Sequence, residues 1–258
     1  MGQPAFKTIQ TLLLALFCLS PAIPSTATTA IALRSRYRVV LAADSRAIYG
    51  INRDATECKL FEIRDVYATV SGLAHYGTSY RATDAVRDGF SRPGDFQSHV
   101  SATAYFVQQR VGHLLASLQR NNPNEYRLLM QRSGLQSDFV AIAVAESVNG
   151  QPMLGIVELQ RNTGPNTLVA KVAVCPGNCR QGDGLFYLGY WEQIRAYVAN
   201  SGQPRSVGSA ASIDRLIRLE INAHPAEVAA PINILELGSS GPRWLQNGGN
   251  CSLPGVGW

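Results

Sequence analysis

Hydrophobic residues form short runs along this chain, and such runs are typical of β-strands. Two hairpins are predicted near the start, because paired apolar runs rich in β-branched residues flank polar turns. Their strands are Thr29–Leu33 with Arg38–Ala43, and Lys59–Ile63 with Val66–Val70. Later runs of the same kind predict six further strands: Phe139–Ala145, Met153–Leu159, Leu168–Val174, Phe186–Leu188, Pro231–Leu237 and Arg243–Leu245.

One of these runs differs from the others in being apolar at every position. Phe139–Ala145 has no polar residue, so we expect a strand that is covered on both faces. Asn149-Gly150 follows, and this dipeptide predicts a tight hairpin turn before the chain returns.

Apolar residues recur every three or four positions elsewhere, which predicts helices. The clearest stripe runs from Val100 to Leu118. Further helices are predicted at Leu73–Phe90, ended by Pro93-Gly94, and from about Trp191 to Val198 and about Ser209 to Asn222. The order is strands, two helices, strands, two helices, strands. Two sheets that flank, or are sandwiched by, helix pairs satisfy this order.

Composition indicates a globular chain. Of the 258 residues, 46% are hydrophobic and 16% are charged, which excludes an intrinsically disordered protein. The net charge is +5, but the basic residues are scattered, so we expect no nucleic-acid partner. Only Lys7, Lys59 and Lys171 are lysines, and all other basic residues apart from histidine are arginines. Lys59 therefore stands out as a compact ammonium in an arginine-rich chain.

The first 27 residues have the pattern of a cleavable signal peptide. Lys7 precedes an apolar core, Leu12–Leu19, that is too short to span a bilayer as a helix. No second long apolar run follows, so we expect an exported protein, periplasmic or extracellular, without stable membrane insertion.

The cut is expected after Ala27, where small residues precede the bond. A cut after Ala22 or after Ala30 is the alternative, and the latter would remove Thr28. The expected domains are thus a signal peptide, residues 1–27, and a single folded domain, residues 28–258.

Four cysteines remain after this cut. An even number in an exported protein predicts disulfides, and four cysteines allow three pairings. We favour Cys175 with Cys179, which closes a tight Pro-Gly-Asn loop, and hence Cys58 with Cys251. A metal site is the weaker interpretation, because no histidine lies at ligand spacing.

Cleavage after Ala27 would make Thr28 a new N-terminus. Its α-amine and its hydroxyl would then form a base–nucleophile pair on one residue. An α-amine has a pKa of about 7.7–8.0 and suits a general base near neutral pH.

The surrounding residues resemble the N-terminus of proteasome β-type subunits, which are N-terminal-nucleophile (Ntn) hydrolases. The similarity is carried by Thr28-Thr29-Ala30, by Val40-Leu41-Ala42-Ala43-Asp44-Ser45-Arg46-Ala47, by Cys58-Lys59-Leu60-Phe61 and by Ser71-Gly72-Leu73-Ala74. The resemblance implies an α+β fold, a four-layer αββα sandwich. The N-terminal third carries specific motifs, and the rest matches by element order.

The resemblance also implies a role for each matched residue. Thr28 would attack a carbonyl carbon, Lys59 would assist through its positive charge, and Asp44 would hold Lys59. The Gly72 N–H would stabilise the oxyanion, a donor typically worth roughly 3–4 kcal/mol. The implied substrate pocket is lined by Ala47, Val70 and Ala74.

The sequence departs from the family where other members support the N-terminal amine. In place of the family's Ser-Asp-x-x-Ser support, Pro225 and Val228 fall at the Asp and second Ser positions, and Tyr190 falls where the third helix begins with Ser. His224 and Glu227 are the local candidates to substitute.

The function predicted from these residues is a threonine-type amidohydrolase or peptidase that forms an acyl-enzyme on Thr28. The alternatives are a non-catalytic proteasome-like subunit and a small-amide acylase. The expected partners are a peptide or small amide substrate, and the resemblance adds a homo-oligomeric ring. No cofactor or metal is expected, since the histidines share no metal spacing; they are His75, His99, His113 and His224.

Overall fold

The fold is built on two five-stranded antiparallel sheets. A computed structural model describes residues 28–49, 53–133, 138–162, 168–179, 184–201, 208–249 and 251–252. The first sheet has the strand order β12-β1-β2-β13-β14, and the second has the order β11-β10-β9-β6-β5. The proposed signal peptide, residues 1–27, lies outside the described residues.

The first sheet contains the chain's first hairpin at its centre. Its strands are β12 (Leu185–Gly189), β1 (Thr29–Ser35), β2 (Arg38–Ala43), β13 (Asn233–Gly238) and β14 (Gly241–Gln246). All of them pair antiparallel, and β2 pairs with β13, so the first hairpin of the described chain lies beside its last hairpin, β13–β14.

The second sheet is formed by two hairpins and one added strand. Its strands are β11 (Leu168–Cys175), β10 (Gln151–Arg161), β9 (Val140–Val148), β6 (Val66–Gly72) and β5 (Leu60–Ile63). Asn149 and Gly150 connect β9 to β10 with φ of 52° and 76°, as the predicted tight turn requires. The predicted strands of both sheets are confirmed, with boundaries shifted by a few residues.

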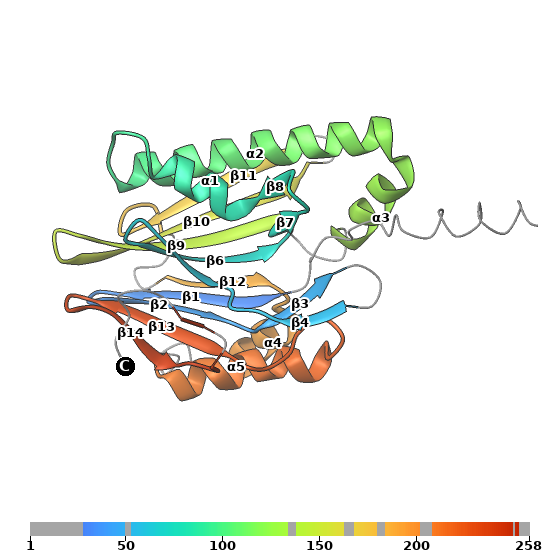
Figure 1. Cartoon of the computed structure of the whole chain (residues 1–258). Helices are drawn as coiled ribbons and strands as arrows, with labels where there is room; N and C mark the ends of the chain where they lie inside the picture. Colours follow the sequence, from blue (N-terminus) through green and yellow to red (C-terminus); the bar gives the residue numbers. More distant parts are fainter. Residues whose placement is uncertain are drawn as a thin grey trace, which may run out of the picture.

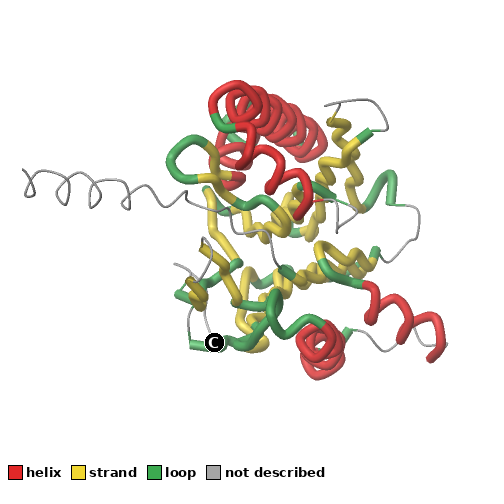
Figure 2. The backbone as a smooth tube through the Cα atoms, turned by 90° about the vertical axis from the view of Figure 1, so that its right-hand side faces the viewer, coloured by secondary structure: helices red, strands yellow, loops and turns green. Residues whose placement is uncertain are grey.

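Helices lie outside the two sheets. Helices α1 (Ala82–Gly89) and α2 (Phe96–Asn121) cover the second sheet, and α4 (Glu192–Ser201) and α5 (Ala210–Ala223) cover the first (Figure 1). Turned by 90°, the strands occupy the middle of the molecule and the helices its two outer sides (Figure 2). A further helix, α3 (Pro123–Ser133), follows α2.

Side chains alternate between the two faces of each strand, and this alternation divides the core. On β6, Val66, Ala68 and Val70 pack in the cluster beneath α1 and α2, whereas Tyr67 packs between the sheets. On β1, Ala30 and Ala32 pack between the sheets. The inner faces carry many alanines, while the outer faces carry larger aliphatic residues against the helices.

The prediction of one helix across Leu73–Phe90 is wrong in its first half. Residues 75–81 form a small hairpin, β7 (His75–Tyr76) with β8 (Tyr80–Arg81), and the helix begins only at Ala82. Gly77 adopts φ of +50°, which turns the chain back. Local strand pairing therefore overrides the helical spacing of the apolar residues in this segment.

A second small hairpin, β3 (Arg46–Tyr49) with β4 (Arg53–Thr56), was not predicted. Its strands have four residues each, Arg-Ala-Ile-Tyr and Arg-Asp-Ala-Thr, and neither shows the apolar alternation on which strand prediction depends. Helix α3 was not predicted either.

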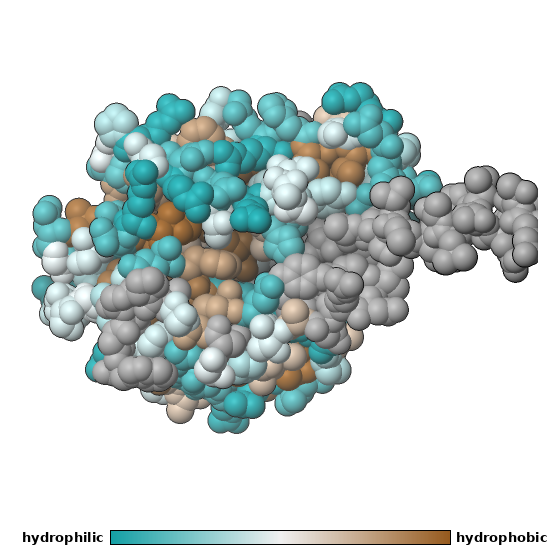
Figure 3. All heavy atoms as spheres, viewed as in Figure 1, coloured by the Kyte–Doolittle hydropathy of each residue, from teal (hydrophilic) through white to brown (hydrophobic). Residues whose placement is uncertain are grey.

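The surface agrees with this layering. Figure 3 shows mostly polar residues over the helical layer at the top and apolar residues between the layers. Among the described helices, none combines the length and apolar character that a membrane span would need.

Candidate active site

Thr28 lies at the entrance to β1, directly before the strand begins. Ala30 and Ala32 face the space between the sheets, so strand alternation directs the Thr28 side chain to the same side. The residue is 4% exposed. The hydroxyl of the predicted nucleophile is therefore held in the protein interior.

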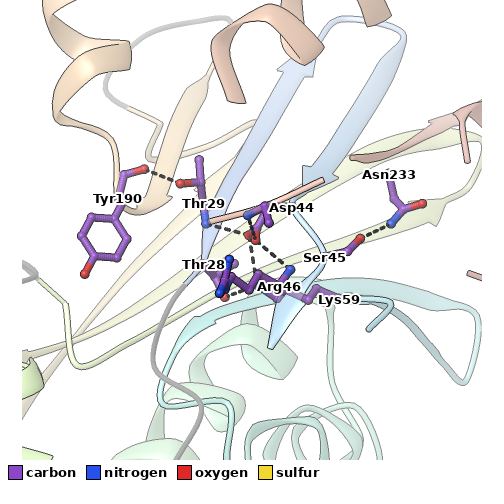
Figure 4. A network of polar contacts seen from close by, with 9 residues as sticks. Thr28, Thr29, Asp44, Ser45, Arg46, Lys59, Tyr190 and Asn233 are labelled. Carbon is purple, nitrogen blue, oxygen red and sulfur yellow. Dashed lines mark hydrogen bonds and ion pairs between the residues drawn. The ribbon is translucent and has the colours of Figure 1, made fainter. Parts of the chain in front are cut away.

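Lys59 meets this hydroxyl. Its Nζ donates to Thr28 Oγ1 at 2.8 Å and to Asp44 Oδ1 at 3.0 Å (Figure 4). The Lys59 side chain is 8% exposed, and that of Asp44 is 0% exposed. Three residues singled out from the sequence are thus brought together, although 31 positions separate Thr28 from Lys59.

Asp44 is held by backbone amides as well as by the ammonium. Oδ1 also accepts from the Thr29 N–H at 2.9 Å. Oδ2 accepts from the N–H groups of Arg46 at 2.9 Å and Ala229 at 3.3 Å. A buried carboxylate is costly without such donors. These contacts tie together the end of β2, the start of β1 and the loop before β13.

Two effects act in opposite directions on Lys59. Burial, the larger effect, lowers the pKa of its ammonium, because desolvation disfavours the charged form. The negative charge of Asp44 and the hydrogen bond to it act to raise the pKa. The net direction is downward, so this lysine releases a proton more readily than one in water.

Gly72 ends β6 in a conformation that suits glycine. Its φ is +74°, and a Cβ would lie 2.5 Å from the backbone oxygen of Phe139. The next amide, of Leu73, donates to that oxygen on the β9 side. β6 pairs with β5, the strand that begins directly after Lys59, so Gly72 and Lys59 belong to neighbouring segments of the same sheet.

A short segment at the end of β12 holds the backbone of Thr28. The Tyr190 N–H donates to the Thr28 carbonyl at 3.1 Å, and the Tyr190 carbonyl accepts from Thr29 Oγ1 at 3.0 Å. A Cβ on Gly189 would overlap the Thr28 carbonyl oxygen, and its φ is +79°. We call Gly189-Tyr190 the strap. Its close approach requires glycine.

Two buried hydroxyls lie on the inner face of β6. Thr69 Oγ1 and Ser71 Oγ have no hydrogen-bond partner among the described residues. Ser71 Cβ and the Thr28 carbonyl both lie within 3.3 Å of the position that a Gly189 Cβ would take. Ser71 therefore lies beside the backbone of Thr28.

The predicted cysteine pairs are confirmed, since Cys58 is bonded to Cys251 and Cys175 to Cys179. Cys58 directly precedes Lys59, so the first bridge anchors the lysine-bearing segment to the end of the chain.

The three predicted pocket residues are placed less directly. Val70 is 2% exposed and packs in the cluster beneath α1 and α2, and Ala74 packs against that cluster. Ala47 lies on β3, and its side chain is outside the described set. Their assignment to a substrate pocket stays a prediction.

Several supporting residues could not be identified from the sequence. Ser45 Oγ accepts from the Asn233 side-chain amide at 2.9 Å, and Asn233 Oδ1 accepts from the Gly248 N–H at 2.8 Å. Ser45 was part of the matched motif and Asn233 lay within the predicted strand Pro231–Leu237, but nothing in the sequence indicated that their side chains meet. The strap likewise depends on backbone groups, which no side-chain pattern reveals.

The fold and this site define an α/β protein with antiparallel sheets and a buried threonine–lysine–aspartate cluster. No protein-family model matches the chain, and no curated protein matches it in sequence. Among solved structures, it is similar to Anbu (ancestral beta-subunit) from Yersinia bercovieri, with a TM-score of 0.50 and 9% identity over 85% of this chain and 87% of that one.

A Gly-1 mutant of Anbu from Hyphomicrobium sp. strain MC1 matches with a TM-score of 0.49 and 12% identity, over 82% of each chain. At such identities the similarity to the Yersinia protein concerns the fold alone. The proteasome-like fold expected from the sequence is confirmed at that level.

Proposed function

We propose that this protein is an exported threonine-type amidohydrolase with Thr28 as its nucleophile. One observation carries the proposal. Lys59 Nζ lies 2.8 Å from Thr28 Oγ1 while it forms an ion pair with buried Asp44. Removal of residues 1–27 by signal peptidase would supply the α-amine beside this hydroxyl.

In the proposed reaction, Thr28 Oγ1 attacks the substrate carbonyl carbon and its proton passes to the Thr28 α-amine. The positive field of Lys59 favours the developing alkoxide. The protonated α-amine of Thr28 then delivers this proton to the leaving amine, and an ester remains on Thr28. Water, deprotonated by the same α-amine, hydrolyses the ester and restores the hydroxyl.

The oxyanion of the tetrahedral intermediate would be stabilised by the Gly72 N–H. The place of Gly72 at the end of β6 supports this role, because β6 pairs with the strand that begins directly after Lys59 and an oxyanion donor must lie where charge develops. Asp44 acts through Lys59 and is a positioning residue.

The proposal also covers the layer architecture, the substrate pocket, export and assembly. We assign the arrangement of sheets and helices to the four-layer αββα Ntn sandwich. Ala47, Val70 and Ala74 would line the pocket and admit an apolar side chain. The two disulfides support export. A homo-oligomeric ring outside the cytoplasm would meet little ATP, so the expected substrates are small or unfolded.

N-terminal sequencing of the exported protein and covalent labelling test the proposal together. The mature chain should begin at Thr28, and an epoxyketone or β-lactone probe should modify it. Thr28→Ala should abolish labelling, whereas Thr29→Ser, one position away, should retain it. A mature start at another residue, or equal labelling of wild type and Thr28→Ala, would exclude this mechanism.

A non-catalytic proteasome-like subunit is the second candidate, and the residues around the amine favour it. Pro225 and Val228 offer no hydroxyl or carboxylate at the positions where the family supports the amine. Tyr190 has a phenol at the third such position, and its ring packs against His224. A chain that starts at Thr28 and remains unlabelled would support this candidate. A small-amide acylase shares the mechanism, and a panel of peptide and small-amide substrates separates the two.

A further inference from the structure

Three side chains of metal-binding type meet where α4 begins and α5 ends. Glu192 opens α4, Glu220 lies in the last turn of α5, and His224 caps that helix. One ligand atom from each lies within 4.8 Å of the other two. Because 28 positions separate Glu192 from Glu220, no sequence motif links them.

Glu220 is the unusual member of this cluster. Its side chain is completely buried. Oε1 accepts from the Ile194 N–H at 2.9 Å, which caps the start of α4. Oε2 has no hydrogen-bond partner among the described residues. A buried carboxylate oxygen thus faces the cluster without a donor.

His224 presents a second unsatisfied atom to the same point. Its Nε2 lies 3.6 Å from Glu220 Oε2 and also lacks a hydrogen-bond partner in the described chain. The ring stacks on Tyr190 at a centroid distance of 4.6 Å, which restrains its orientation. The 3.6 Å separation is beyond a hydrogen bond. It is close to the roughly 3.4 Å that separates neighbouring ligands on tetrahedral zinc.

A simple ion pair between His224 and Glu220 explains less of this geometry. It would leave both facing atoms, Glu220 Oε2 and His224 Nε2, without a hydrogen bond. The exposed Glu192 carboxylate, which accepts from the Trp191 N–H at 3.1 Å, adds a further negative charge beside this pair. A divalent cation bound between Glu220 Oε2 and His224 Nε2 would give both of these atoms a partner.

We propose that Glu192, Glu220 and His224 form a binding site for a divalent transition-metal ion of the zinc class. One imidazole nitrogen and two carboxylate oxygens suit such an ion, whereas calcium and magnesium prefer oxygen ligands alone. Glu192 is exposed, so the ion has an entry path and its fourth position remains open to water.

The site lies next to the strap. His224 packs against Tyr190, and Glu192 lies two residues after Tyr190 in the chain. A bound ion would therefore join the start of α4 to the end of α5 beside the strap. Tyr190 in turn holds the backbone of Thr28 and Thr29. Metal binding would stiffen the support of the N-terminus, but binding itself requires no hydrolase activity.

Titration of untagged, chelator-treated protein with Zn²⁺ by calorimetry tests the site. The expected result is one ion per chain. Glu220→Gln and His224→Gln, which each remove one ligand, should weaken binding at least tenfold. His113→Gln removes an exposed histidine of α2 and should leave binding unchanged. Co²⁺ titration should give visible absorption with the intensity of a low-symmetry site of four or five ligands.

Glu192→Gln keeps the test valid if the variants of the buried residues misfold, because Glu192 is exposed. It too should weaken binding at least tenfold in a protein that remains folded by circular dichroism. The proposal is overturned by the absence of saturable binding to the wild type, or by equal affinity in wild type and Glu192→Gln.

Discussion

At the scale of single residues, Lys59 is subject to two opposing effects, the desolvation of its ammonium and the attraction of Asp44. Lys59 is 7% exposed as a residue, and the ion pair with Asp44 compensates only part of the desolvation. Because burial of a charge is costly, a lysine without a task is seldom retained at such a position. Its contact with the Thr28 hydroxyl provides a chemical reason for keeping it.

Lys59 should make the stability of this protein depend on pH. Its folded-state pKa is lower than the 10.5 of the unfolded chain, so between these values the unfolded state binds more protons. Stability therefore rises with pH through this window, by up to about 1.4 kcal/mol per pH unit. Denaturation from pH 7 to pH 9.5 should show the wild type gaining stability relative to Lys59→Met.

Lys171→Met is the matched control, because Lys171 is exposed. The difference between wild type and Lys171→Met should not change with pH. If the stability difference between wild type and Lys59→Met is equally independent of pH, the lowered pKa of Lys59 is contradicted.

The unpartnered hydroxyl of Thr69 should cost stability. Thr69→Val keeps the shape of the side chain and removes an unsatisfied buried group, so we expect the free energy of unfolding to rise by about 1 kcal/mol. Thr103→Val is the control, because Thr103 is equally buried and donates to the His99 carbonyl at 2.9 Å. Chemical denaturation should show stabilisation for the first variant and none for the second.

At the scale of elements, the end of β12 determines where Thr28 lies. β12 pairs with β1 at Thr29 and Gly189, and the strap then crosses the Thr28 carbonyl. The strand thus does more than extend the sheet, since it fixes the residue that precedes β1.

Gly189→Ala should destabilise the protein strongly. The added Cβ would overlap backbone, which cannot move as a flexible side chain can, and the positive φ adds about 1–2 kcal/mol of strain. Gly241→Ala separates the two effects, because Gly241 has φ of +96° but nothing lies within 4 Å of its Cβ position. Thermal denaturation should show a larger loss for Gly189→Ala, and equal losses would show that the close approach is unimportant.

At the scale of the whole molecule, one disulfide joins segments that are far apart in the chain. Cys58 and Cys251 are separated by 193 positions, whereas Cys175 and Cys179 are separated by 4. A bridge restricts the unfolded chain more when it closes a longer loop. The long bridge also anchors the residue next to Lys59, so it contributes to both stability and the position of the lysine.

Replacing Cys58 and Cys251 together by alanine should lower the free energy of unfolding by about 2–5 kcal/mol. The corresponding double replacement of Cys175 and Cys179 should cost less, because its loop is short. Denaturation of both variants without reductant provides the comparison. An equal or larger loss from the short loop would rule out loop closure as the dominant effect.

The local pattern of residues was sufficient to predict the strands of both main sheets, the long helix α2 and the turn at Asn149-Gly150. These features depend on the spacing of apolar residues and on the backbone freedom of single residues, which the sequence contains directly. The residues Thr28, Asp44 and Lys59 could also be chosen from the sequence, because they lie in compact motifs that resemble a known family.

The tertiary structure alone decided which distant groups meet. The strap approaches Thr28 from a segment more than 150 residues away, and it acts through backbone atoms that have no signature in side-chain type. Glu192, Glu220 and His224 converge only when α4 packs against α5. Contacts of this kind arise from long-range packing, which no local pattern encodes.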